Sequence, residues 1–213
     1  MTSLARGLLP SPLPDSIPIP EVQPPAGMDI VAVPTGVTKR VAAFGYRGGS
    51  LFDRRDFNIG SVLVRHPRGD LLVDAGFGRD IDLQFATMPR WFRQMTNYEL
   101  WMPARDQLEA AGYDFGRLSG ILLTHAHWDH VSGLPDFPDV PVLAPVREQA
   151  ALRREGMHGY FGPPFRDTTF LWRALEFDGG PISGFLGAWT STTTARWCAC
   201  RPPATRQAAS LCS

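Results

Sequence analysis

The sequence predicts an α/β fold, because short apolar segments typical of strands alternate with segments of helical character along the middle of the chain. Three observations support this class. Residues 61–74 have the pattern of a β-hairpin, residues 120–124 form a continuous apolar run, and residues 141–154 combine a short apolar segment with a helical one. We find no internal repeat at a fixed period.

Size and composition limit the class of protein. The chain has 213 residues, of which 44% are hydrophobic and 20% charged, so it has enough apolar side chains for one domain with appendages. The net charge is zero, which argues against a nucleic-acid-binding surface and favours a small-molecule substrate. No apolar run is long enough for a membrane-spanning helix, and prolines interrupt the start before a secretory signal forms, so we expect a cytoplasmic protein without a membrane partner. The oligomeric state is left open.

The N-terminal elements are predicted as follows. Residues 1–27 contain seven of the twenty prolines and little periodicity, so we expect a disordered leader. Residues 29–33 have the pattern of a strand. The apolar segments 61–65 and 71–74 flank a turn that contains proline and glycine, and we expect them to pair as a hairpin.

Helices are expected between the later strands. The region 80–112 offers an apolar face, and Pro89 and Pro103 mark expected breaks in it. The run at 120–124 resembles a strand buried on both faces. A strand at 141–144 and a helix at 146–154 follow, which completes the alternation.

The last part of the chain differs in composition from the rest. All 21 acidic residues lie within the first 178 positions, and none occurs in the 35 residues that follow. The three cysteines are confined to the end, at Cys198, Cys200 and Cys212, where they cannot cross-link the fold. We therefore predict a leader at 1–27, one domain at 28–180 and an atypical tail at 181–213.

Four side chains that bind metals occur within six residues, directly after the apolar run at 120–124. They are His125, His127, Asp129 and His130. In an extended loop the first two rings project to one side and can chelate one ion, and the last two residues can serve a second ion. The alternative is a solvent-exposed loop rich in histidine that binds nothing.

This motif resembles the His-x-His-x-Asp-His motif of the metallo-β-lactamase superfamily, and residues 71–76 resemble the upstream strand of that family, which ends in Asp and Gly. The resemblance covers residues 28–180 and implies an αββα sandwich, of which this chain contains mainly the N-terminal half. It implies His125 and His127 as ligands of one metal, and Asp129 and His130 as ligands of another. Asp74 would support the loop from behind the ligands, although an Asp before Gly can also simply form a turn.

The resemblance implies the chemistry of a hydrolase with two divalent metal ions, most readily Zn²⁺, with Fe or Mn as alternatives. A metal-activated water would attack a small ester, lactone or thioester, and Asp129 would orient the water and transfer its proton. Two alternatives stay open. One is a catalytically incomplete fragment of such a hydrolase, and the other is a mononuclear iron oxygenase of the same superfamily.

The family's downstream ligands are missing from the tail. After His158 there is no histidine, and after Asp178 there is no carboxylate side chain. When the codons from Pro181 onward are read from their third base, one permitted translation contains a Gly-His segment of the type the family uses, so we expect the tail to be out of frame. We expect His158 itself to lie in a surface loop, with a place in the substrate pocket as the alternative, and we expect His66 to be exposed in the hairpin turn.

Deletion of residues 1–25 should leave the free energy of unfolding almost unchanged, because this segment has few apolar side chains to bury. Urea denaturation of the shortened and the complete chain measures the difference. A loss of more than about 2 kcal/mol is typical of removing packed core and would contradict the assignment of a leader.

Overall fold

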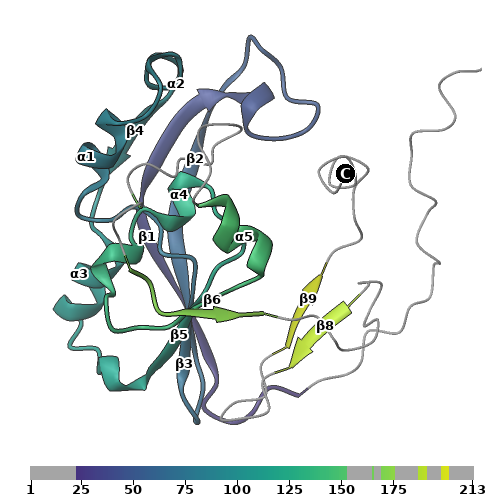
Figure 1. The fold of residues 1–213 in the computed structure, drawn as a ribbon, viewed down its shortest axis with the longest axis vertical. Coiled ribbons are helices and arrows are strands. Elements are labelled where there is room, and N and C mark those ends of the chain that lie inside the picture. The colour runs from purple at the N-terminus through teal and green to yellow at the C-terminus, as the bar shows by residue number, and fades with distance from the viewer. Residues whose placement is uncertain (1–22, 153–164, 166–168, 176–186, 191–197, 202–213) are drawn as a thin grey trace, which may run out of the picture. The chain divides into compact units, whose positions relative to one another are not determined.

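The computed structural model describes residues 23–152, 165, 169–175, 187–190 and 198–201. Most of them belong to one compact unit, Pro25–Leu175, which is built on a seven-stranded mixed sheet with the strand order β4-β1-β2-β3-β5-β6-β7 (Figure 1). A separate pair of antiparallel strands, β8 (Gly187–Thr190) and β9 (Cys198–Arg201), belongs to a second unit. Within the described residues, no helix is long and apolar enough to cross a membrane.

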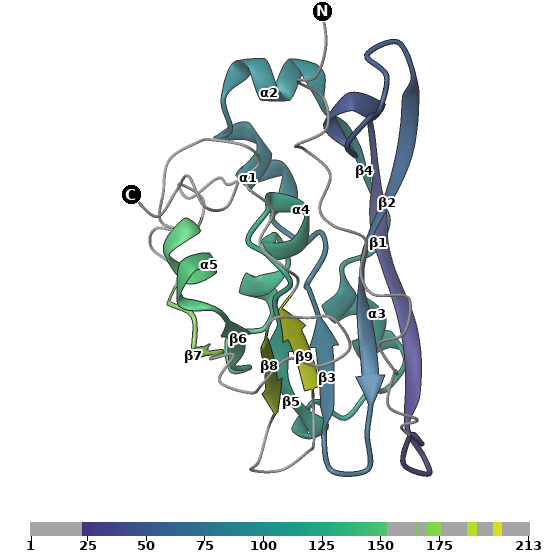
Figure 2. The same cartoon turned by 90° about the vertical axis from the view of Figure 1, so that its right-hand side faces the viewer.

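The first half of the sheet is antiparallel. Its two longest strands, β1 (Asp29–Val41) and β2 (Arg54–Arg65), pair along their whole length and run side by side in Figure 2. Strand β3 (Asp70–Val73) continues the hairpin from β2, and β4 (Asn97–Leu100) pairs with the other side of β1. The predicted hairpin is therefore present, with a first strand that begins seven residues earlier than the sequence pattern indicated.

The second half of the sheet is parallel. Strand β5 (Leu118–Leu122) pairs with β3, and β6 (Val142–Ala144) and β7 (Trp172–Ala174) follow in order. In parallel strands the carboxyl ends meet at one edge, where ligands bind in open α/β sheets. The loops after β3, β5 and β6 are therefore brought to the same edge of the molecule.

Short helices connect these strands. They are α1 (Ile81–Ala86), α2 (Arg90–Met95), α3 (Ala104–Ala110), α4 (Trp128–Val131) and α5 (Val146–Ala151), with 3-10 turns at η1 (Ala42–Phe44), η2 (Phe115–Arg117) and η3 (Leu134–Asp136). The expectation of helices in the region 80–112 is confirmed for α1, α2 and α3. Residues 97–100 of this region form the edge strand β4, which was not predicted, because their backbone pairs with β1.

Two apolar clusters hold the unit together. The larger one lies under the parallel strands and includes Leu72, Ile121 and Val142, which are almost completely buried. The smaller one is mainly aromatic and gathers Phe77, Phe92 and Trp128 with Ile59, Ile81 and Met88. The larger cluster includes residues of both halves of the sheet, such as Val33 and Leu63 of the antiparallel strands, whereas the smaller one gathers aromatic rings around Ile59 of β2.

His66 does not lie on the surface as expected. It is 5% exposed, and its backbone N–H donates to Asp70 Oδ1 at 2.9 Å while its Nδ1 accepts from the Arg68 backbone N–H at 3.1 Å. These bonds close the turn between β2 and β3, at the opposite ends of the strands from the loop that contains the three-histidine motif. The predicted leader and the predicted tail fall mostly outside the described residues, so the boundaries at 27 and 180 remain predictions.

Substitution Ile121→Ala should lower the free energy of unfolding by about 2–5 kcal/mol, because it removes a fully buried side chain from the central strand and leaves a cavity. Leu83→Ala is the matched control, since Leu83 is 70% exposed on α1 and its loss should cost less than about 0.5 kcal/mol. Chemical denaturation compares the two variants. Equal losses would contradict the assignment of β5 to the core.

Candidate metal centre

The predicted site residues meet at the carboxyl edge of the parallel strands. Strand β3 ends just before Asp74, and β5 ends just before the loop that contains His125 and His127. Helix α4 then begins at Trp128, with His127 as its extended N-cap, and turns Asp129 and His130 away from the strand direction. The short helix therefore brings the second half of the motif back towards the first.

Asp74 connects the two strand ends. Its carboxylate accepts hydrogen bonds from the Thr124 backbone N–H at 2.8 Å and from the Thr124 hydroxyl at 2.7 Å, and its Oδ2 lies 2.7 Å from His130 Nδ1. Its backbone has a φ of 56°, which is uncommon for a residue other than glycine and best tolerated by Asp and Asn. Asp74 thus does more than form a turn, because its side chain bonds to two parts of the motif.

The three imidazoles of the motif lie against one another. The ring centroid of His125 is 4.4 Å from that of His127 and 4.0 Å from that of His130. His125 Nδ1 also lies 3.0 Å from the Thr124 hydroxyl. In His125 and His130 the Nδ1 atoms therefore face hydroxyl or carboxylate oxygens, which leaves Nε2 as the atom able to bind a cation.

Burial favours the neutral form of two of these rings. It lowers the pKa of His127 to about 4, with a further contribution from the neighbouring His125, and it lowers the pKa of His125, with a further contribution from His130. Burial opposes the charged form of His130 as well, but the hydrogen bond and charge of Asp74 raise the pKa of His130 overall. Neutral imidazole is the form that coordinates metals, and contact with a carboxylate strengthens such a ligand.

Asp129 lies beside these rings and is partly exposed. Its charge favours protonation of His125, His127 and His130, which places the carboxylate within electrostatic reach of all three. Burial lowers the pKa of Arg40, at the end of β1, and the charge of Asp129 acts in the opposite direction. Asp129 is thus the carboxylate of the motif that faces the imidazole cluster.

Glu148 supports the loop from α5. It is 8% exposed, and its Oε2 accepts a hydrogen bond from the Ala126 backbone N–H at 3.0 Å. Ala126 stands between the first two histidines, so this bond fixes the backbone from which both side chains project. Nothing in the sequence around Glu148 indicates this role, because the contact joins two segments that are 22 residues apart.

The backbone after β3 is bonded to the other end of the motif. The Ala75 N–H donates to the His130 carbonyl at 2.9 Å, and the Gly133 N–H donates to the Gly76 carbonyl at 2.9 Å. Gly76 has a φ of 61°, and a Cβ there would lie 2.4 Å from the Thr35 hydroxyl oxygen, so no other residue fits without a shift. These contacts hold α4 in register with the end of β3.

The donor set fits a divalent cation by its chemistry, because it combines neutral imidazoles with a carboxylate at the end of a rigid strand. In the part of the chain that the structure describes, however, no three His, Cys, Asp or Glu side chains are arranged to hold one ion. The rings are gathered but pack against one another. The described side chains therefore form a cluster of donors and not a finished coordination shell.

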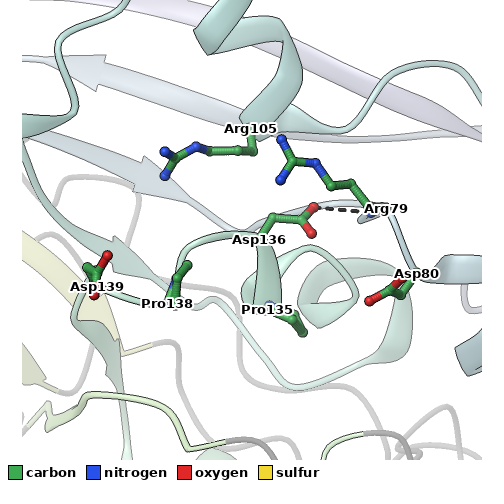
Figure 3. Close-up of a pocket in the computed structure, with 7 residues that line it drawn as sticks. All are labelled: Arg79, Asp80, Arg105, Pro135, Asp136, Pro138 and Asp139. Carbon is green, nitrogen blue, oxygen red and sulfur yellow. Dashed lines mark hydrogen bonds between the residues drawn. The ribbon is translucent and has the colours of Figure 1, made fainter.

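A cavity of about 400 Å³ lies elsewhere and is not this site (Figure 3). Its two arginines already have acidic partners. Arg79 bonds to Asp106 and to Glu109, its backbone N–H donates to Asp136 Oδ2 at 3.1 Å, and Arg105 bonds to Glu109 at 2.6 Å. The cavity contains none of the residues that the sequence singled out.

The structure thus gathers Asp74, His125, His127 and His130, with Asp129 beside them, while their roles as ligands stay predictions. Sequence reasoning missed Thr124, Glu148 and Arg40, of which only Thr124 adjoins the motif. His158 lies outside the described residues.

The sequence matches the Metallo-beta-lactamase superfamily over residues 54–198. Among solved structures, the chain is similar to an N-acyl homoserine lactone hydrolase with the product N-hexanoyl-L-homoserine bound at its catalytic metal centre, with a TM-score of 0.55 and 20% identity over 73% of this chain and 62% of the other. An AiiA variant from B. thuringiensis with bound N-decanoyl-L-homoserine gives the same values. A probable metal-dependent hydrolase from Staphylococcus aureus follows, with a TM-score of 0.50 and 16% identity over 74% of this chain and 62% of the other.

These structural similarities concern the fold, which they confirm as that of the superfamily. The chain spans only about 62% of the length of the lactone hydrolases that it resembles. No curated protein matches the sequence.

Substitution Asp74→Ala should lower the free energy of unfolding by about 1–3 kcal/mol, because it leaves the partly buried donors of Thr124 and His130 without their acceptor. Asp74→Asn should cost less, since Asn also tolerates a positive φ and can still accept from the Thr124 N–H. Urea denaturation gives both values, and the amide chemical shift of Thr124 reports the bond. A larger loss for Asn than for Ala would contradict this account.

Proposed function

The chain belongs to the metallo-beta-lactamase superfamily, and from this premise we propose that it is a metal-dependent hydrolase acting on a small ester, lactone or thioester. The observation that carries the proposal is the cluster of His125, His127 and His130 at the carboxyl edge of the sheet, with Asp74 bonded to the last ring. The lactone hydrolases of similar fold support the choice of substrate class.

We assign the residues of the motif as follows. His125 and His127 would hold one divalent cation, and Asp129 and His130 would contribute to a second, with zinc as the preferred metal and iron or manganese as alternatives. Such a cation would polarise a carbonyl and lower the pKa of a bound water. These ligand and cofactor assignments rest on the donor chemistry of the cluster and on the family motif.

Other side chains would orient the imidazole ligands and transfer the proton. Asp74 holds His130 by its Nδ1 and keeps Nε2 directed away from the strand ends, while Glu148 fixes the backbone between His125 and His127. Asp129 would accept a proton from an attacking water and return it to the leaving group. In this proposal the imidazole ligands are held at a rigid strand end, and the carboxylate of Asp129 transfers the proton.

A second candidate is a catalytically incomplete member of the same family. One observation favours it: within the described residues no group of three donors is arranged to hold one ion. The sequence argument for an out-of-frame tail after residue 180 gives the same result, since it removes the downstream ligands. A cytoplasmic location and a small-molecule partner also stay predictions.

The complete chain should bind fewer than two zinc ions after dialysis, because four donors from one loop leave both coordination shells open. Elemental analysis measures the ratio. His127→Ala should lower it further, whereas Cys198→Ser and Cys200→Ser, the matched controls in the tail, should not change it. Two tightly held ions would show that ligands exist that the sequence did not reveal.

Hydrolysis of N-hexanoyl homoserine lactone and of 4-nitrophenyl acetate tests the activity itself, with added Zn²⁺, Mn²⁺ or Fe²⁺. We expect Asp129→Asn to reduce turnover by about 10²- to 10⁴-fold while it retains part of the metal, because the carboxylate handles the proton as well. The same assay on a chain with the frame restored after residue 180 should show higher turnover. If neither chain hydrolyses any ester, lactone or thioester, the proposed activity is wrong.

A further inference from the structure

Two donor groups close to the motif lack hydrogen-bond partners. Arg40, the penultimate residue of β1, has its Nε and Nη2 atoms buried with no acceptor among the described residues, and the indole Nε1 of Trp128 is buried in the same state. Both side chains belong to one group, because the Arg40 guanidinium lies 5.6 Å from the Trp128 ring. Unsatisfied buried donors are rare and costly in native proteins.

The two nitrogens of Arg40 form a single recognition edge. In a guanidinium the Nε–H and one Nη2–H bond point in parallel from the same side of the plane, which matches the two oxygens of a carboxylate. A carbonyl oxygen could satisfy only one of these donors. The geometry of the unpaired edge therefore favours a planar, bidentate anion over a neutral acceptor.

Within the described residues, no acceptor bonds to the Nε and Nη2 atoms of Arg40. The guanidinium stacks near two aromatic rings, at 5.1 Å from the centroid of Phe92 and 5.6 Å from that of Trp128, and such contacts stabilise a cation only in part. Burial lowers the pKa of Arg40, and the charge of Asp129 acts in the opposite direction, but no ion pair joins these two side chains within 4.0 Å in the described residues. Within the described residues, the guanidinium of Arg40 is thus largely buried and has no carboxylate in direct contact.

Arg40 also lies close to the imidazole cluster. The charge of Arg40 contributes to the lowered pKa of His127, and the charge of Asp129 acts on Arg40. Trp128 lies between His127 and Asp129 in the sequence. An anion on Arg40 would therefore lie beside the motif. By contrast, the arginines of the cavity in Figure 3 are already paired with acidic side chains, so that cavity offers no equivalent edge.

We propose that Arg40, with the Trp128 indole, binds a carboxylate group of the substrate, and that the substrate is an ester, lactone or thioester which carries a free carboxylate besides the bond to be cleaved. This inference rests on the proposed function. Both nitrogens of the edge are buried, so the carboxylate reaches them only after the side chains that cover them move. Exclusion of water then strengthens the charged hydrogen bonds.

The test uses monoethyl succinate, which carries one carboxylate, and diethyl succinate, its neutral analogue. Both are titrated calorimetrically into the full chain after treatment with a chelator, so that no cation can supply the contact with the carboxylate. We expect the monoester to bind at least about 10-fold more tightly than the diester. Equal affinities in the unsubstituted chain would overturn the proposal without any variant.

Variants locate the contact. Arg40→Gln should remove the preference for the monoester, and Arg40→Lys should restore only part of it, because Lys keeps the charge but lacks the two parallel donors. Arg54→Gln is the matched control: it removes one exposed arginine from the neighbouring strand β2 and should keep the full preference. If Arg40→Gln retains the preference, or if Arg54→Gln loses it equally, the contact is not at Arg40 and the proposal is wrong.

Failure of the proposed function gives a different result. A chain that binds the monoester through Arg40 but hydrolyses no ester contradicts the hydrolase assignment and supports the carboxylate site. A chain that hydrolyses neutral and acidic esters with the same kcat/KM, and binds both equally, supports the hydrolase assignment and contradicts the site. If Arg40→Gln does not fold, the comparison of Arg40→Lys with the unsubstituted chain decides.

Discussion

The carboxylate of Asp74 is the contact on which the candidate site depends most. It is buried at the end of β3, and it bonds both to Thr124 at the end of β5 and to His130 on α4. One side chain therefore fixes the separation of two parallel strands, the start of the motif loop and the orientation of its last ring. The backbone accepts a positive φ to reach this position, and local strain of this kind is characteristic of functional sites.

The aromatic cluster explains why the motif contains a tryptophan. Trp128 is 1% exposed and packs on Phe77, Phe85 and Phe92, so the first residue of α4 anchors the helix in the core while its neighbours His127 and Asp129 stay at the edge. The ring that anchors the loop also carries an indole N–H without an acceptor among the described residues. Packing and recognition thus use the same side chain, and α4 needs only four residues to be well positioned.

Much of this arrangement could be predicted from the sequence, but only where local patterns determine it. The alternation of apolar segments predicted the hairpin of β2 and β3 and the buried strand β5, and the spacing of the histidines located the site. The strand at 97–100 could not be recognised, because it depends on pairing with β1 some sixty residues earlier. Arg40 and Glu148 were missed for the same reason: each approaches the motif from a distant element, and nothing near them in the sequence marks the contact. His66 shows the converse, since a turn sequence that looked exposed is buried by bonds to Asp70.

The charges at this edge of the sheet are separated in a way that a hydrolase of carboxylate-bearing substrates can use. Burial keeps His125 and His127 neutral, so the imidazole cluster offers lone pairs to a cation and adds little positive charge of its own. Arg40 cannot lose its charge in this way, because the intrinsic pKa of a guanidinium is too high. Its charge and that of Asp129 flank Trp128 without forming an ion pair in the described part of the chain. Were they paired directly, the carboxylate would be held by Arg40 and could not act at the imidazoles. The proposed roles of Asp129 as proton acceptor and of Arg40 as anion-binding group both require that the two side chains stay unpaired with each other, as they are in the described part of the chain.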